Sequence, residues 1–286
     1  MPITFKEINY VYSSDMPYAY QALKDINLEI ATGKITAIIG ETGSGKSTMV
    51  QHLNALLLPS SGTLDIAGYH IVANEKTKGL KQLRRKVGLV FQFSEYQLFE
   101  ETVIKDVAFG PKNFGDDEHL AMQKAAAALK MVGIDQSFFE RSPLDLSGGQ
   151  KRRVAIAGIL AMEPEIIVLD EPTAGLDPKG ANEMITLFNA LNKKFHKTVI
   201  LVTHDNEVVY NYADDVVLLA HGEVVLHTSV KELFDDYDLL NQYHLIKPQV
   251  VELKAMLNAR GFKLSHDIRD IPSLVKALAG GKKWTN

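Results

Sequence analysis

The stretch ITAIIGETGSGKSTMV, residues 35–50, decides the fold. It begins with an apolar run that is typical of a strand buried on both faces. The pattern GETGSGKS at residues 40–47 follows directly and opens a helical segment, the context that a phosphate-binding loop requires. A chance glycine-rich turn is the alternative, and the complete motif in this context argues against it.

This loop has the chemistry to hold a nucleotide and its magnesium ion. Glycines let backbone N–H groups close around phosphate oxygens, and the amino end of the next helix adds a favourable field. Lys46 would reach the outer phosphates, and the Ser47 hydroxyl would ligate magnesium. The predicted nucleotide-binding residues of this segment are Gly40, Thr42, Gly43, Ser44, Gly45, Lys46, Ser47 and Thr48.

Two adjacent carboxylates end a second apolar run, EIIVLDE, at residues 165–171. Asp170 is predicted to hold the magnesium ion, as acidic residues do at strand ends beside phosphate-binding loops. Attack of water on the terminal phosphate needs a base beyond the metal ligand, so Glu171 is the predicted general base. A solvated strand end is the plainer interpretation, common for an isolated Asp-Glu pair.

The order of the remaining segments predicts an α/β protein. Short alternating strands fill most of the first ninety residues around one helix, which is expected to run to about Leu58. Residues 93–164 are mainly helical, and apolar strands return at 165–170 and 198–205 around a helix near 181–194. This alternation indicates a parallel sheet, which binds ligands at the carboxyl ends of its strands. Shorter helices follow from Lys231 onward.

Composition excludes several other classes of protein. The chain of 286 residues contains no cysteine, which rules out disulfides and cysteine-ligated metals. Its formal net charge of -4 argues against binding nucleic acid as the main function, and no nucleic-acid partner is expected. No apolar run approaches the ~18 residues of a membrane-spanning helix.

The motifs GETGSGKS, VFQF, LSGGQ, IIVLDEP, AGLD and VTHD occur in the order and spacing of ATP-binding cassette ATPases, and the chain resembles that family over residues 3–227. The resemblance implies an α/β P-loop NTPase fold with a mixed, mostly parallel sheet core and an antiparallel β subdomain. It places a nucleotide-binding domain at 1–228, with a helical subdomain at about 93–164. Residues 229–286 would form a small, mainly helical extension that adds dimer contact.

The resemblance also implies roles for residues outside the phosphate-binding loop. Tyr12 would stack on adenine, although Tyr10 or Tyr18 could take its place. Gln92 would meet the magnesium ion and the attacking water, and His204 would bind the terminal phosphate. By itself His204 is one of nine histidines, but its position at a strand end favours this role. Asp177 would cross to the opposite subunit.

The segment LSGGQKRRVAIAGIL, residues 146–160, resembles the start of a helix with basic residues where the helix dipole favours anions. In cassette ATPases two chains pack head to tail, so that this segment closes over the ATP held by the other chain. Ser147, Gly148, Gly149 and Gln150 would contact that nucleotide. Two interpretations stay open for the basic residues that follow, a contribution to the positive field or simple exposure to solvent: Lys151, Arg152 and Arg153.

Two longer stretches, VFQFSEYQLFEETV at 90–103 and LSGGQKRRVAIAGILAMEPEIIVLDEPTAGLDP at 146–178, are similar to the ATPase subunits of energy-coupling factor transporters, and more so to the second of the two paired ATPases. Ser94 stands where that group usually has proline, which removes a backbone restraint. The resemblance implies an ATP-hydrolysing subunit, at the cytoplasmic face of the membrane, of an importer for vitamins and other micronutrients. Its partners would be a second homologous ATPase or a second copy, a transmembrane coupling protein and an exchangeable substrate-binding membrane subunit.

The membrane partner is expected to contact the chain near Gln92. Apolar side chains lie among acids there, which would suit a partner helix with basic residues. The alternative is that about half of them pack the helical subdomain against the core. The apolar residues are Tyr96, Leu98, Phe99 and Val103.

Other functions compete with this interpretation. The nearest are the ATPase of a cobalt or nickel importer and that of a conventional importer with a soluble binding protein. A cassette protein of DNA repair or chromosome organisation would need a coiled-coil or zinc-bearing insertion, and neither heptads nor cysteines occur. A ribosome-acting cassette protein would hold two cassettes in one chain.

Overall fold

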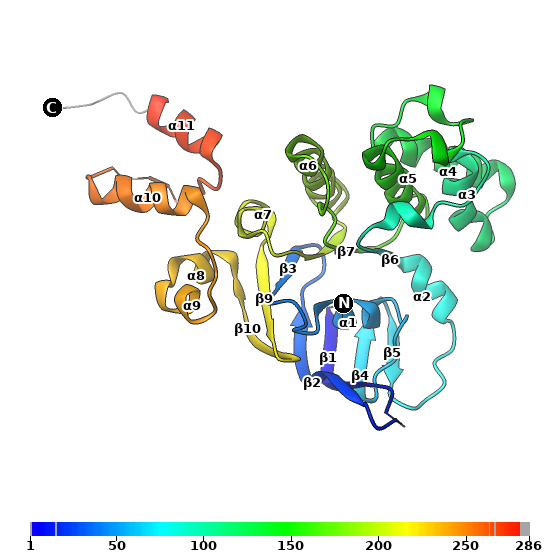
Figure 1. The fold of residues 1–286 in the computed structure, drawn as a ribbon, viewed down its shortest axis with the longest axis horizontal. Coiled ribbons are helices and arrows are strands. Elements are labelled where there is room, and N and C mark those ends of the chain that lie inside the picture. The colour runs from blue at the N-terminus through cyan, green and yellow to red at the C-terminus, as the bar shows by residue number, and fades with distance from the viewer. Residues whose placement is uncertain (1, 15, 263, 266, 281–286) are drawn as a thin grey trace.

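The computed structural model describes residues 2–14, 16–262, 264–265 and 267–280 of the chain. Two sheets form its centre. A helical lobe, residues 94–160, lies on one side, and a series of short helices from residue 230 onward lies on the other (Figure 1). Of the predicted architecture, three parts are confirmed: the mixed sheet, the antiparallel sheet and the mainly helical segment that begins after residue 93.

The larger sheet has six strands in the order β10-β9-β3-β8-β7-β6, and all are parallel except β10. Four of them are buried at every residue, as expected for strands covered on both faces. The strands are β3 (Ile35–Ile39), β6 (Val87–Val90), β7 (Ile166–Asp170), β8 (Thr198–Val202), β9 (Asp215–Ala220) and β10 (Glu223–Ser229).

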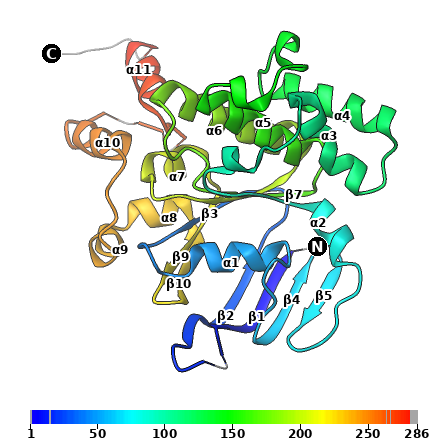
Figure 2. The ribbon, with the colours of Figure 1, turned by 45° about the vertical axis from the view of Figure 1, so that its right-hand side comes forward.

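The smaller sheet is antiparallel, in the order β2-β1-β4-β5. Its strands are β1 (Ile3–Tyr12), β2 (Tyr20–Ile30), β4 (Ser61–Ile66) and β5 (Tyr69–Val72). Helix α1 (Lys46–Leu53) lies between the two sheets (Figure 2). Met49 and Leu53 belong to one buried cluster with Phe5 of the small sheet and Ile38 and Val168 of the large one. The helix that follows the phosphate-binding loop is therefore held from both sides.

The opposite face of the large sheet is covered by helices. Ile39 and Leu169 point to this face, because successive residues of a strand point to opposite faces and their neighbours Ile38 and Val168 face α1. They belong to a second cluster, together with Val154, Ile185 and Val209. The helices on this side are α3 (Val103–Asn113), α4 (Glu118–Met131), α5 (Gly148–Leu160), α6 (Pro178–Phe195) and α7 (Asn206–Tyr212). The remaining elements before the extension are α2 (Leu80–Lys86), η1 (Ser94–Gln97), η2 (Gln136–Phe138) and η3 (Pro143–Asp145).

The extension contains α8 (Val230–Asp235), α9 (Tyr237–Gln242), α10 (Gln249–Ala259) and α11 (Ile271–Gly280). Its inner face continues the second cluster, because the buried ring of Phe234 packs edge-on against Tyr210 at 5.4 Å between ring centroids. The division of the chain at residue 228 stays a prediction.

Helix α1 ends at Leu53 and not near Leu58, so that part of the prediction was wrong. Ala55 has a φ of 52°, outside the helical region, and its N–H donates to the carbonyl of His52 in a turn. The residue types at positions 54–58 do not predict this turn before Pro59.

Within the described residues, no helix has both the length and the apolar character needed to cross a membrane.

His52 of α1 makes stability depend on pH. Its side chain is fully buried, its Nδ1 lies 2.8 Å from the carbonyl of Thr48, and Nε2 has no hydrogen-bond partner among the described residues. Burial lowers the pKa of His52 from 6.5 to about 4. The unfolded chain therefore binds a proton at this residue more readily than the folded chain does.

This difference predicts that stability is lost as pH falls from 6.5 towards 4, by up to about 3 kcal/mol from His52. Urea unfolding of His52→Gln should show a shallower loss of unfolding free energy over that pH range than the wild type. The exposed His119, changed to Gln, is the matched control and should keep the wild-type slope. Equal slopes for His52→Gln and wild type would refute the assignment.

Candidate functional site

A cavity of about 430 Å³ opens at the carboxyl ends of the parallel strands, where ligands bind in α/β folds. It is lined by residues from the loop before α1, from the ends of β6, β7 and β8, and from β2. The predicted site residues that it brings together are Thr42, Gly43, Gly45, Lys46, Ser47, Thr48, Gln92, Asp170, Glu171 and His204. Gly40 and Ser44 of the same loop line a neighbouring cavity instead.

The loop before α1 can be built only with glycine at two positions. Gly40 has a φ of 142°, and a Cβ there would lie 2.1 Å from the carbonyl oxygen of Leu219. Gly45 has a φ of 103°, and its Cβ would lie 2.7 Å from the carbonyl oxygen of Ala22. Gly43 also has a positive φ, of 82°, but a Cβ there would meet only open space. The backbone therefore follows one path against β2 and β9 and stays open on the cavity side.

Lys46, the first residue of α1, pairs with no carboxylate among the described residues. Its Nζ donates to the carbonyls of Gly40 and Glu41, both at 2.7 Å. Burial lowers the pKa of Lys46, and the charges of Glu171 and Asp170 act in the opposite direction. The buried Ser44 hydroxyl has no hydrogen-bond partner among the described residues. A half-buried cation beside a loop with an unsatisfied hydroxyl fits a phosphate-bearing ligand.

The two carboxylates differ in their surroundings. Burial raises the pKa of Asp170, while a hydrogen bond with the Ser47 side chain lowers it. Asp170 and Ser47 are thus adjacent oxygen donors, a set that fits a divalent cation such as magnesium. Glu171 has a φ of 48°, a conformation that costs a non-glycine residue about 1–3 kcal/mol and that is concentrated at functional sites.

Glu171 and His204 contact each other directly. The Nδ1 of His204 lies 2.9 Å from Oε1 of Glu171. The His204 side chain is 80% exposed whereas that of Glu171 is 15% exposed, so the histidine covers the carboxylate from the solvent side. The predicted base and the predicted phosphate-binding histidine therefore meet in one cavity, and their roles stay predictions.

The predicted adenine-stacking residue, Tyr12, lies beside the cavity and not in its wall. Tyr12 bonds through its hydroxyl to Thr48 at 3.1 Å and packs edge-on against Tyr10, but it does not line the cavity. Tyr20, which sequence reasoning missed, does line it. The two are cross-strand partners in the β1–β2 pair, so Tyr20 is found only once the pairing of these two strands is known. Tyr18, the other alternative, is 72% exposed.

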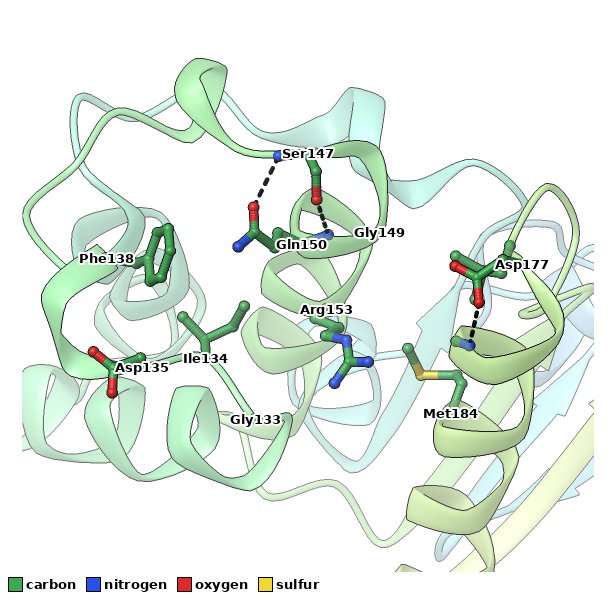
Figure 3. A pocket seen from close by; sticks show the side chains of 12 residues that line it. Gly133, Ile134, Asp135, Phe138, Ser147, Gly149, Gln150, Arg153, Asp177 and Met184 are labelled. Carbon is green, nitrogen blue, oxygen red and sulfur yellow. Dashed lines mark hydrogen bonds between the residues drawn. The ribbon is translucent and has the colours of Figure 1, made fainter.

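The LSGGQ segment lines a different cavity, of about 380 Å³, between the helical lobe and the start of α6 (Figure 3). Ser147, Gly149, Gln150 and Asp177 are among its lining residues, and none of its lining residues also lines the cavity around Lys46. The predicted nucleotide contacts of this chain thus form two separate half-sites.

All three predicted polar side chains of this second half-site take part in helix caps. The Oγ of Ser147 accepts from the backbone N–H of Gln150 at 3.3 Å, and Oε1 of Gln150 accepts from the N–H of Ser147 at 2.9 Å (Figure 3). This capping box begins α5 at Gly148. Asp177 caps α6 by accepting from the N–H of Gly180 at 2.9 Å.

Neither interpretation offered for the basic residues describes Arg152, whereas Arg153 lines the cavity of the LSGGQ segment and is bonded within the chain as well. Arg152 is buried and pairs with Glu95, and Arg153 bonds to the carbonyl of Val132 at 3.1 Å and to Glu183. Both charges are engaged inside the chain, while Lys151 is half-buried at the start of α5. Sequence spacing contains no sign of these partners.

The structure also divides the apolar residues of the expected partner surface. Tyr96 is 84% exposed and Phe99 is 64% exposed. Val103 is fully buried and the partly buried Leu98 packs against the core cluster, so two of the four residues pack inside the chain, as the alternative interpretation predicts. Phe109 joins the exposed set, edge-on to Phe99 at 4.9 Å between ring centroids.

Comparison with known proteins agrees with the geometry. Residues 23–174 match the family model for ABC transporters. The chain belongs to the ATP-binding cassette family. It is 50% identical over 283 residues to the energy-coupling factor transporter ATP-binding protein EcfA2 of Spiroplasma kunkelii, covering 98% of this chain and 93% of that one. The EcfA2 of Lactobacillus delbrueckii subsp. bulgaricus is 51% identical over 278 residues, 97% and 96% of the two chains.

Solved structures of cassettes share the fold. A dimeric ATP-binding cassette in a post-hydrolysis state with ADP and Pi has a TM-score of 0.71 and 33% identity, covering 80% of this chain and 98% of that one. The cbiO1 of Clostridium perfringens, part of the ABC transporter complex cbiONQ, has a TM-score of 0.72 and 39% identity, covering 88% and 98%. The chain is an ATPase of the energy-coupling factor type, which binds ATP and couples its hydrolysis to transport.

Glu171→Gln tests the base directly. The amide keeps the shape of the side chain but cannot take a proton, so ATP should still bind while turnover falls about 10²–10⁴-fold. Nucleotide affinity and single-turnover hydrolysis measure the two effects. Glu165→Gln, at the opposite end of the same strand segment, is the control and should turn over at the wild-type rate. Full turnover in Glu171→Gln would remove Glu171 from the base role.

Proposed function

We propose that the chain is the ATP-hydrolysing subunit of an energy-coupling factor importer for vitamins and other micronutrients. It would work as a dimer with a second homologous ATPase, or with a second copy, beneath a transmembrane coupling protein. An exchangeable membrane subunit would bind the transported substrate. The observation that carries the proposal is the separation of the nucleotide contacts into two half-sites, supported by relatives named as ATP-binding proteins of such transporters.

Head-to-tail pairing would complete both half-sites. The phosphate-binding loop, Asp170 and Glu171 would hold and attack the nucleotide from one chain. Ser147, Gly148, Gly149 and Gln150 would close over it from the other, with Asp177 crossing between them. Release of Ser147 from its bond with Gln150 would free its hydroxyl for the phosphate. ATP would then favour the closed pair and its hydrolysis would release it, a population shift driven by differential binding.

Within the first half-site, each side chain would have a separate task. Lys46 would neutralise the outer phosphates, and Ser47, Asp170 and Gln92 would hold magnesium, which when bound supplies positive charge at the transferring phosphoryl group. Glu171 would take a proton from the attacking water. The bond from His204 Nδ1 would orient the Glu171 carboxylate until the histidine turns to the terminal phosphate.

The base of the nucleotide would lie at the aromatic edge formed by β1 and β2. Tyr12 remains our proposed stacking residue, because its bond to Thr48 fixes its ring beside the start of α1. Tyr20 would complete the wall of this part of the cavity.

The chain would be organised as a cassette at 1–228, with its helical subdomain at about 93–164, and an extension at 229–286 that adds dimer contact. The exposed side chains of Tyr96, Phe99 and Phe109, with the acids Glu100 and Glu101 beside them, would receive a basic helix of the membrane partner. This contact would hold the chain at the cytoplasmic face of the membrane.

A second candidate is the ATPase of a cobalt or nickel importer, favoured by the structural similarity to cbiO1. A conventional binding-protein-dependent importer comes next. All three would use the same ATPase chemistry and differ in the membrane proteins beneath the pair.

The partners can be identified by capturing tagged Glu171→Gln protein from native membranes in mild detergent and naming the retained chains by mass spectrometry. The proposal predicts a second cassette ATPase, one larger membrane protein and several small, differing membrane proteins. A single dedicated membrane set would indicate the metal importer. Ribosomal or DNA-bound partners would overturn the transport role while leaving the ATPase intact.

Ser147→Arg tests whether Ser147 acts on a nucleotide that the other chain holds. Nucleotide binding by the isolated chain should stay within about twofold of wild type, whereas turnover of the pair should be lost because the long cation blocks close approach of the second chain. Isothermal titration and steady-state hydrolysis measure the two effects. Gln123→Arg, at an exposed position of the helical lobe, is the control and should be active. A large loss of affinity in the isolated Ser147→Arg chain would contradict the trans assignment.

A further inference from the structure

Arg152 of α5 is a buried cation whose side chain is 4% exposed. It makes a two-pronged ion pair with Glu95 of η1, with Nε 3.0 Å from Oε2 and Nη2 2.9 Å from Oε1. The Glu95 side chain is 16% exposed, so solvent screens this pair weakly. The planar guanidinium matches a carboxylate in this arrangement, which lysine cannot reproduce.

The remaining nitrogen of the guanidinium bonds to a different segment. Nη1 donates to the carbonyl of Ala174, in the turn that follows β7. That turn is closed by the N–H of Ala174 donating to the carbonyl of Glu171 at 3.2 Å. The guanidinium also lies 5.9 Å from the centre of the Phe93 ring, which follows Gln92 directly.

One side chain therefore joins three parts of the ATPase machinery. Glu95 is three residues beyond Gln92, Arg152 is five residues beyond Ser147, and Ala174 closes the turn that begins at Glu171. Arg153, the neighbouring cation, makes no bond of this kind, since its partners are in the lobe and on α6.

Stability alone is a poor explanation for this arrangement. A buried ion pair recovers little beyond the cost of desolvating its charges, and apolar residues of similar volume often hold a fold as well or better. What an apolar pair cannot do is fix the carbonyl of Ala174 in direction and distance.

We propose that Arg152 is a positioning residue, which holds the Glu171 turn in one arrangement relative to the Gln92 segment and the LSGGQ helix. A displacement of η1 then moves the guanidinium, and the guanidinium moves the turn that carries the predicted base. If the exposed surface around Tyr96 and Phe99 docks the membrane partner, as in the proposed function, this is the route by which docking reaches hydrolysis. The positioning role of Arg152 rests on the ATPase activity alone and does not depend on which membrane partner docks.

The test compares four full-length variants, purified in the assembly that the wild-type chain forms. Arg152→Lys keeps the charge, Arg152→Met removes it, and the double change Glu95→Met with Arg152→Met replaces the pair by apolar side chains. Arg85→Met breaks another internal pair, Arg85 with Asp116 at 2.9 Å, outside the nucleotide cavity, and serves as the matched control.

The first readout is amide hydrogen exchange. Loss of Arg152 should speed exchange in peptides covering residues 171–177 about tenfold or more, because local opening of the turn becomes easier, while peptides covering 40–48 stay protected. The second is kinetic. The kcat per bound nucleotide should fall about 10–100-fold with KM for ATP nearly unchanged, as a small misplacement of a catalytic group predicts.

The double variant separates positioning from stability. Its thermal midpoint should recover towards wild type, because no buried charge is left unpaired, yet its kcat should stay as low as that of Arg152→Met. The Lys variant should also stay slow. Recovery of kcat together with stability in the double variant, or exchange that rises equally across the chain, would overturn the positioning role. These readouts stand whichever membrane partners the capture experiment finds.

Discussion

The burial of α1 between two sheets is the constraint on which the rest of the site depends. One cluster of side chains joins Met49 and Leu53 to both sheets, so the amino end of the helix has a fixed place at the edge of the large sheet. Gly40 and Gly45 pass so close to neighbouring backbone that a side chain would clash. Packing thereby fixes the path of the predicted phosphate-binding loop.

This packing also concentrates charge. The carboxyl ends of parallel strands place Asp170 and Glu171 opposite Lys46 in a partly desolvated cavity, where burial moves the pKa of Lys46 down and that of Asp170 up. Charges held this way lose part of their hydration, and a bound ligand of opposite charge offsets that cost. In the half-site around Ser147, Arg153 lines the cavity but is paired with Glu183, and Arg152 is buried against Glu95.

Local patterns in the sequence predicted most of the fold and the first half-site. The apolar run 35–39 and the glycine spacing after it specify strand, loop and helix without reference to distant residues. The end of α1 was missed because it depends on a left-handed residue, Ala55, that its type does not announce. Tyr20 and the Arg152–Glu95 pair were missed for another reason. They depend on which segments the tertiary fold brings together, and residues 57 positions apart show no periodic signal.

We propose that the binding site of a nucleotide held by Lys46 is completed by a different chain. The most direct measurement is a cryo-electron microscopy structure of the ATP-loaded Glu171→Gln assembly isolated from membranes. We expect Ser147 to contact the terminal phosphate of a nucleotide whose phosphate-binding loop belongs to the other ATPase chain. Ser147 and Lys46 of one chain on the same nucleotide would contradict it.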